Sequence, residues 1–232
     1  MIKQFVFLIF FYTHFCLAQF SGKVEYDLIL GDDPRFSYNQ ELTNMLINAQ
    51  QLSEDLSYSL YFDKDKSYFE INEQPINTRK YFTFFACVST KPDRSSYSDL
   101  KKQLFTANYF DIFFNKNFII EDKVNYHWII TDEEKIINNL KVVKANGLTR
   151  DKEPIEAWFT PEIPVSTGPE NFMGLPGLIL ELQVLYTKYV CRKIEFTDVY
   201  NSKILKPTEA EVISYGGYDE LLNKMSDFFK DQ

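Results

Sequence analysis

Apolar and polar residues alternate along much of this chain with the two-residue period of half-buried β-strands. The first example is residues 22–30, in which Val24, Tyr26, Leu28 and Leu30 are apolar and most positions between them are charged. A strand with this pattern turns one face to a core and the other to water. The first folded element is therefore predicted to be a half-buried strand of a sheet.

Similar strand signals recur down the chain, with turn-forming residues between them. Residues 80–90 are aromatic and β-branched enough to predict a strand buried on both faces, and residues 91–98 are rich in turn formers and predict a loop. Together these patterns predict strands at residues 22–30, 58–62, 68–71, 80–90, 109–114, 118–121, 127–131, 140–145, 155–159, 178–185 and 189–199.

Two segments have the period of amphipathic helices instead. Residues 38–55 place apolar side chains at helical spacing, and Ser37 followed by Gln40 resembles a capping box at the start of this helix. Residues 217–230 repeat the pattern near the C-terminus. The order of elements predicts a mainly β, β-rich α+β fold: a large curved antiparallel meander sheet or half-barrel, with an N-terminal-half helix and a C-terminal helix packed against it.

The first 18 residues have the order of a secretory signal peptide. Lys3 precedes an apolar run at residues 5–15, and Cys16-Leu17-Ala18 then offers a cleavage site after Ala18. The run is shorter than the roughly 20 apolar residues that a membrane-spanning helix needs. We expect residues 1–18 to be removed and residues 19–232 to form a single β-rich domain that is secreted, in the periplasm or associated with the outer membrane.

The charge and the cysteines narrow the picture further. The formal net charge is −8, which opposes binding to nucleic acid or to an anionic lipid surface. No later segment is apolar enough to span a membrane. Cys87 and Cys191 remain after the signal peptide, and in an oxidising compartment they could form one disulfide or stay as two buried thiols. The sequence does not give the distance that decides between these two states.

Candidate chemistry is scarce in the predicted mature chain. His127 is its single histidine, in a predicted strand, and no Gly-x-Ser-x-Gly motif accompanies it. The acids Asp132, Glu133 and Glu134 are expected to be solvated in a turn. A metal ion would require ligands from distant strands to join His127. The sequence therefore predicts no catalytic residue, no metal site and no cofactor.

The most distinctive segment is residues 154–183, where prolines, glycines and hydrophobic residues recur regularly. At its centre, residues 174–179 read Gly-Leu-Pro-Gly-Leu-Ile. Pro176 favours the second position of a type II turn, and Gly177 could supply the positive φ required at the third. We therefore predict a structural turn made by Gly174, Pro176 and Gly177, leading into the strand at residues 178–185.

This segment resembles the GLPGLI family of secreted bacterial proteins, which is named after the hexapeptide that the chain carries intact. At the family's spacing the chain also has Trp128-Ile129, Lys144-Ala145, Ala157-Trp158, Thr160-Pro161-Glu162-Ile163-Pro164 and Gly168-Pro169. Near Lys144 the family often has a cysteine, whereas this chain has Val142, so the resemblance does not imply a shared structural disulfide. The resemblance implies export and a β-rich fold. It does not identify any catalytic residue in this chain.

The aromatic and proline residues around the hexapeptide are the candidate binding surface. Trp158, Phe159, Pro161, Pro164 and Phe172 could line a groove for an apolar ligand or a peptide. The alternative is that these side chains cover the end of the sheet core, because aromatic residues mostly serve packing.

Three functions are compatible with these patterns. The first is a non-enzymatic envelope protein that binds a partner protein, or carries an apolar ligand, through a curved sheet. The second is an envelope hydrolase with unrecognised acidic catalytic residues, and the third is an assembly or structural component of the outer membrane. A carrier needs a concave apolar cavity, whereas a hydrolase needs ionisable side chains that converge in a cleft.

Overall fold

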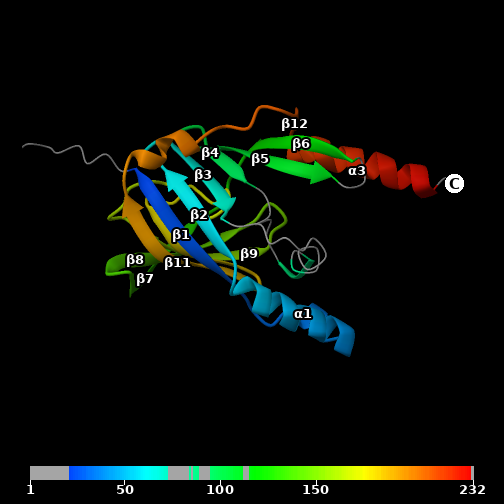
Figure 1. Ribbon diagram of the computed structural model, residues 1–232, viewed down its shortest axis with the longest axis horizontal. Helices are drawn as coiled ribbons and strands as arrows, with labels where there is room; N and C mark the ends of the chain where they lie inside the picture. The colour runs from blue at the N-terminus through cyan, green and yellow to red at the C-terminus, as the bar shows by residue number, and fades with distance from the viewer. Residues whose placement is uncertain (1–20, 73–83, 85, 89–94, 112–114, 231–232) are drawn as a thin grey trace, which may run out of the picture.

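The described strands all join one curved sheet (Figure 1), which confirms the predicted β-rich architecture. The structure is a computed structural model and describes residues 21–72, 84, 86–88, 95–111 and 115–230. The predicted signal peptide lies outside these residues. No helix in the described ranges is both long and apolar enough to cross a membrane.

The strands are β1 Gly22–Leu30, β2 Ser57–Phe62, β3 Lys66–Ile71, β4 Ser96–Asp99, β5 Leu104–Asp111, β6 Lys116–Lys123, β7 Ile129–Ile137, β8 Leu140–Leu148, β9 Pro154–Thr160, β10 Leu178–Val184, β11 Thr187–Phe196 and β12 Glu211–Ile213. The helices are η1 Pro34–Phe36, α1 Gln40–Ser53, η2 Val199–Lys203 and α3 Tyr215–Lys230.

The sheet is largely a meander with one crossing point near its middle. Its order is β12-β6-β5-β4-β3-β2-β1-β11-β10-β9-β8-β7. β1 pairs with β2 on one side and with β11 on the other, so the first and last thirds of the chain meet there. Neighbouring strands are antiparallel except β12, which pairs in parallel with β6. The two edges of the sheet are therefore β12 and β7.

The core is built from alternate residues of the strands, as the two-residue period predicts. In β1 the apolar residues Val24, Tyr26 and Leu28 are almost fully buried. Aromatic rings fill the middle of the core: Tyr58 stacks on Phe69, and Tyr189 meets both rings edge-on. Packing of aromatic rings against one another adds to the apolar area that each ring buries.

The amphipathic helix forms as α1, but its capping residue differs from the prediction. Asn39 is the N-cap, and its side chain accepts a hydrogen bond from the backbone N–H of Leu42. The Ser37 hydroxyl instead donates to the carbonyl of Pro34, and Ser37 caps the end of η1. Leu46 and Ala49 are buried against the core, while α1 as a whole extends away from the sheet in Figure 1.

Two sequence predictions between residues 80 and 99 are wrong. The buried strand expected at residues 80–90 is not formed in its described part, because Phe84, Ala86 and Cys87 are helical. The loop expected at residues 91–98 instead contributes β4, which pairs with β3 and β5. Composition alone misjudged residues 96–98 because ladder partners far away in sequence decide whether such a segment becomes a strand.

The hairpin of β7 and β8 corrects two further predictions. Asn138 and Asn139 both have positive φ, as a two-residue type I′ turn requires, so the turn lies there. The predicted turn at residues 132–134 lies inside β7, at a bulge where the register shifts between Ile130 and Glu134. His127 is not in a strand but in the exposed connection that precedes β7.

The C-terminal helix forms as α3 and docks on the β5–β6 side of the sheet (Figure 1). The Tyr218 hydroxyl donates to the Tyr109 hydroxyl over 2.8 Å. The Arg150 guanidinium lies 4.5 Å from the ring centre of Tyr215 and 3.0 Å from a carboxylate oxygen of Asp219. The turn between β8 and β9 is thereby tied to the start of α3.

Cys87 and Cys191 are both buried thiols, and no disulfide joins them. Of the two states that the sequence left open, the structure has the second. Burial raises the pKa of each thiol to about 11. For Cys191, hydrogen bonding from Asn138 opposes this rise without cancelling it.

We expect both thiols to resist alkylation in the native protein. At pH 8 a pKa of about 11 rather than 9.0 leaves about 100-fold less thiolate, and the thiolate is the reacting form. Iodoacetamide labelling of residues 19–232, followed by mass spectrometry, should be slow in buffer and fast in urea. Rapid native labelling of either residue would contradict the burial of its thiol.

Candidate functional site

The loop between β9 and β10, residues 161–177, reaches strands that are distant in the sheet. The Thr167 hydroxyl donates to the Ser67 hydroxyl of β3 over 2.8 Å, and the Ser96 hydroxyl of β4 donates to the carbonyl of Glu170 over 2.7 Å. Three strands, β2, β1 and β11, separate β3 from β10. The loop therefore makes hydrogen bonds across the curved sheet to strands that are not neighbours of β9 or β10.

A second set of contacts fastens the same loop to the connection before β7. The Trp128 indole N–H donates to the carbonyl of Met173 over 2.9 Å. The Tyr126 ring stacks on Phe172, with ring centres 4.7 Å apart. Because these contacts join the loop to segments far away in sequence, the loop is a fixed part of the fold.

The hexapeptide at residues 174–179 adopts a different backbone from the predicted turn. Gly174, not Gly177, has the positive φ, at 102°. Gly177 is required for another reason: a Cβ there would lie 2.1 Å from the carbonyl oxygen of Thr160. The type II assignment is therefore wrong, and Gly177 allows β9 and the start of β10 to approach closely.

The five residues of the predicted binding surface do not form one exposed groove. Phe159 and Phe172 are buried in the main core, and Trp158 is 9% exposed. Only Pro161 and Pro164 are exposed. This arrangement fits the packing alternative for the three aromatic residues.

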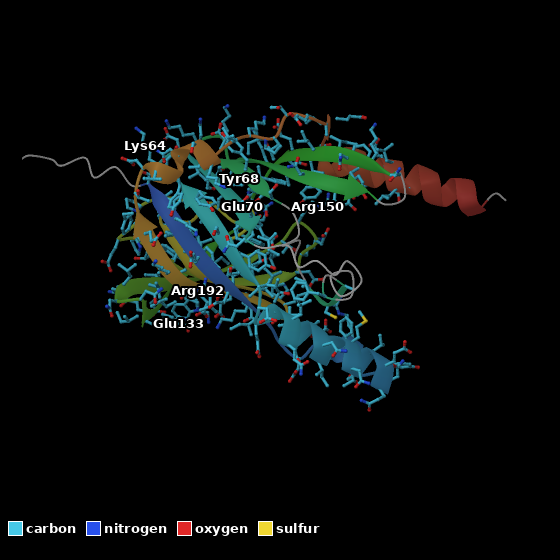
Figure 2. The ribbon with its side chains drawn as sticks, in the orientation of Figure 1. Lys64, Tyr68, Glu70, Glu133, Arg150 and Arg192 are labelled. Atoms are coloured by element: carbon cyan, nitrogen blue, oxygen red, sulfur yellow. The ribbon has the colours of Figure 1, made fainter. Side chains whose placement is uncertain are left out.

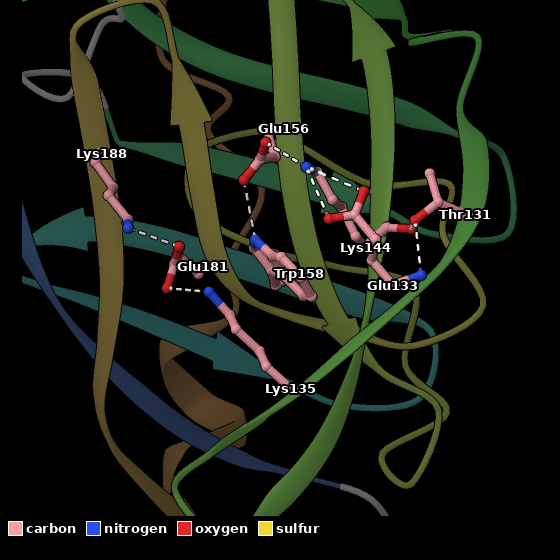
Figure 3. Close-up of polar contacts among 8 residues, drawn as sticks. All are labelled: Thr131, Glu133, Lys135, Lys144, Glu156, Trp158, Glu181 and Lys188. Carbon is pink, nitrogen blue, oxygen red and sulfur yellow. Dashed lines mark hydrogen bonds and ion pairs between the residues drawn. The ribbon is translucent and has the colours of Figure 1, made fainter.

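Trp158 instead lies inside a network of charged residues (Figure 3). Because neighbouring residues of a strand point to opposite faces, this network lies on the other face of β9 from Phe159. The Lys135 ammonium lies 4.1 Å from a ring centre of Trp158, and the indole N–H donates to Glu156 over 3.0 Å. Lys144 pairs with Glu156 at 3.0 Å and with Glu133 at 3.3 Å. The ring is thus covered by the stems and charges of two lysines.

The same network contains a buried carboxylate, Glu181 of β10. Lys135 lies 2.9 Å from one of its oxygens and Lys188 lies 2.7 Å from the other. Lys135 belongs to β7, which crosses in front of β9 in Figure 3 to reach Glu181. The ion pair therefore holds the edge hairpin over the sheet.

Hydrogen bonds shift the pKa values of Glu156 and Lys144 in this network. Burial would raise the pKa of Glu156, but bonds from Lys144 and Trp158 hold it below its ordinary value. The pKa of Lys144 is raised, chiefly by its hydrogen bond to Glu156. Both groups therefore stay charged at neutral pH, and neither is suited to exchange a proton with a substrate.

A second buried carboxylate, Glu170, lies in the β9–β10 loop and was missed in the sequence. The Tyr189 hydroxyl donates to it over 2.5 Å, and the residue has an unusual positive φ of 53°. Its neighbours Gly168 and Pro169 are the signal that could have marked a constrained loop position. The contact ties the loop to β11 in the core.

Exposed apolar residues gather on β7, at the edge of the sheet. Ile129, Ile130 and Ile136 are 69%, 49% and 66% exposed, respectively. Figure 2 shows Glu133, which lies between them in β7, at the margin of the molecule remote from α3. On its other side β7 has no partner strand among the described residues. The sequence did not single out this edge, because the turn was predicted inside it.

The fold defines a β-rich protein built on one open curved sheet. Residues 131–181 match the family model Porph_ging, described as a protein of unknown function. The matched stretch runs from β7 to β10 and includes the hexapeptide and all residues named in the Trp158 network except Lys188. No curated protein matches the chain significantly. Nowhere in the described ranges do three His, Cys, Asp or Glu side chains gather in a way that could hold a metal ion.

The chain is similar in fold to PNGF-II in two crystal forms. Both comparisons have a TM-score of 0.55 and 14% sequence identity, and they cover 87% and 88% of this chain but 33% of each PNGF-II chain. The chain thus spans about a third of the length of these proteins. An uncharacterized conserved protein from Thermus thermophilus has a TM-score of 0.34 at 8% identity, with 75% of this chain and 99% of that chain covered.

Proposed function

We propose that this protein is an exported, non-enzymatic member of the GLPGLI group that binds a partner protein along the edge strand β7. The observation that carries the proposal is the concentration of exposed isoleucines on this edge. Soluble proteins usually cover or charge a long edge strand, because its backbone groups can pair with another chain. An edge strand of nine residues with isoleucines at both ends is a suitable place for a partner strand to add.

The hairpin turn indicates which backbone groups are available. In a two-residue hairpin the residues flanking the turn, Ile137 and Leu140, form a hydrogen-bonded pair. The next pair, Ile136 with Lys141, is then a non-hydrogen-bonded pair, so the N–H and C=O of Ile136 point to the open side. The end of the edge strand at Ile136, whose side chain is 66% exposed, therefore also offers backbone donors and acceptors.

The signal-peptide pattern and the match to the family model support the proposal of a partner in the cell envelope. The order of residues 1–18 is that of a signal peptide, and the hexapeptide lies within the stretch that matches the family model. The burial of Phe159 and Phe172 favours a protein partner over an apolar ligand, because these side chains are engaged in the core.

Photocrosslinking tests the proposal. A benzophenone amino acid in place of Ile136 should crosslink to a discrete protein in the cells that naturally produce this chain. The matched control is Leu205, which is 68% exposed and lies outside the sheet. The same label there should give no such product. Identical products from both positions, or none from Ile136, would contradict binding at β7.

A further inference from the structure

The middle of the β7 edge carries a compact negative charge. Asp132, Glu133 and Glu134 are exposed and lie between Ile130 and Ile136. The bulge that contains them is held in shape by Thr131, whose hydroxyl donates to the Lys144 carbonyl and accepts from the Glu133 N–H, each over 3.2 Å. The edge therefore presents three acids between apolar ends, and Lys135, which follows the acids, is paired with Glu181.

This order opposes pairing with a second copy of the chain. In an antiparallel pair of β7 strands centred on Glu133, Asp132 of one copy would face Glu134 of the other. Like charges directly opposite one another destabilise a strand pair. The net charge of −8 adds a general repulsion between copies. The acidic block thus protects the edge from self-association and leaves it open to an oppositely charged strand.

The acids retain capacity for a partner's cations. Glu134 pairs with Lys141 at 2.8 Å and Glu133 pairs with Lys144, but the two carboxylate side chains remain 49% and 56% exposed. Within the described part of the chain no cation pairs with Asp132. Exposed pairs of this kind are weak and exchange easily.

From this complementarity we infer that the partner docks through an extended segment with lysine or arginine at its centre and aliphatic residues on both sides. The inference rests on the proposed binding at β7. The aliphatic residues pack as cross-strand neighbours of Ile130 and Ile136, and the cations meet the acidic block.

Three synthetic nine-residue peptides test the inference on the chain of residues 19–232. They share valine and threonine flanks and differ only in a central Lys-Lys-Lys, Gln-Gln-Gln or Glu-Glu-Glu. We expect the lysine peptide to bind about 10-fold more tightly than the glutamine peptide at low salt, and the glutamate peptide to bind most weakly. The advantage of the lysine peptide should shrink in high salt.

Two triple variants separate local from overall charge. D132N/E133Q/E134Q should abolish the preference for lysine and keep binding of the glutamine peptide. The control E41Q/E54Q/D55N removes the same three charges on or beside α1 and should keep the preference. Equal binding of all three peptides, or loss of the preference in both variants, overturns the cationic partner while leaving docking at β7 intact. Binding of none of the peptides overturns both.

Discussion

Replacing Gly177 with alanine is expected to cost about 3 kcal/mol of unfolding free energy. The new Cβ would lie 2.1 Å from the carbonyl oxygen and 2.7 Å from the carbonyl carbon of Thr160. These are backbone atoms of β9, where Thr160 pairs with Leu178 of β10. They cannot withdraw without disturbing the pairing of two core strands. Urea denaturation of residues 19–232 measures the loss.

Two neighbouring substitutions distinguish close approach from backbone conformation. Gly174→Ala should cost about 1 to 2 kcal/mol, because Gly174 has a φ of 102° but its nearest neighbouring atoms lie 3.5 Å from a new Cβ. Pro176→Ala should cost less than about 1 kcal/mol, since the ring is exposed. An equal loss in all three variants would contradict the steric explanation for Gly177.

Strands with one buried face were predictable from the sequence. In β1 the burial alternates almost perfectly with the predicted period, and β10 and β11 form the hairpin expected near residues 178–199. A shift of one residue would turn Val24 and Leu28 toward water, so the pattern determines both the strand and its register. This is why the strands with alternating patterns could be predicted from the sequence.

Segments without alternation were not predictable in this way. The aromatic run that contains Phe84 reads equally well as a buried strand or a buried helix, because periodicity does not separate the two. β4 reads Ser-Tyr-Ser-Asp, a turn-like composition. Its Ser96 and Ser98 are nonetheless buried between β3 and β5, so tertiary pairing overrides local preference.

The candidate site was misread because neighbouring aromatic residues point to opposite faces. Trp158 and Phe159 are adjacent in the sequence, and residue type alone assigns them to one surface. In β9 Phe159 turns to the core, and Trp158 turns to a network supplied by Lys135 of β7 and Glu181 of β10. Those partners become neighbours only through strand pairing, so the network has no local signature in the sequence.

The loop between β9 and β10 has a structural role, which leaves the edge strand β7 as the candidate binding surface. Hydrogen bonds tie the loop to β3, β4 and the connection before β7, and its aromatic residue, Phe172, is buried. The Lys135–Glu181 ion pair in turn holds β7 across the sheet. The family-matched stretch can therefore be understood as a scaffold that fixes the position of an exposed apolar edge.

Phe172→Ala is expected to destabilise the protein by about 3 to 5 kcal/mol. The side chain is buried, and its ring stacks on Tyr126 with ring centres 4.7 Å apart. Its removal would leave a cavity where the loop meets the connection before β7, and Tyr126 would lose its stacking partner. The shift of the urea unfolding midpoint, at an unchanged slope, measures this effect.

The comparison with Pro164 decides between packing and binding for the predicted surface. Pro164 lies in the same loop but is exposed, so Pro164→Ala should change the stability by less than about 1 kcal/mol. Phe172→Leu should cost less than about 1.5 kcal/mol, because it retains most of the apolar volume. If Phe172→Ala were as harmless as Pro164→Ala, the ring would be dispensable for packing, and a role in ligand contact would have to be reconsidered. A large loss with partial retention by leucine would establish Phe172 as a core residue that fastens the hexapeptide loop to the sheet.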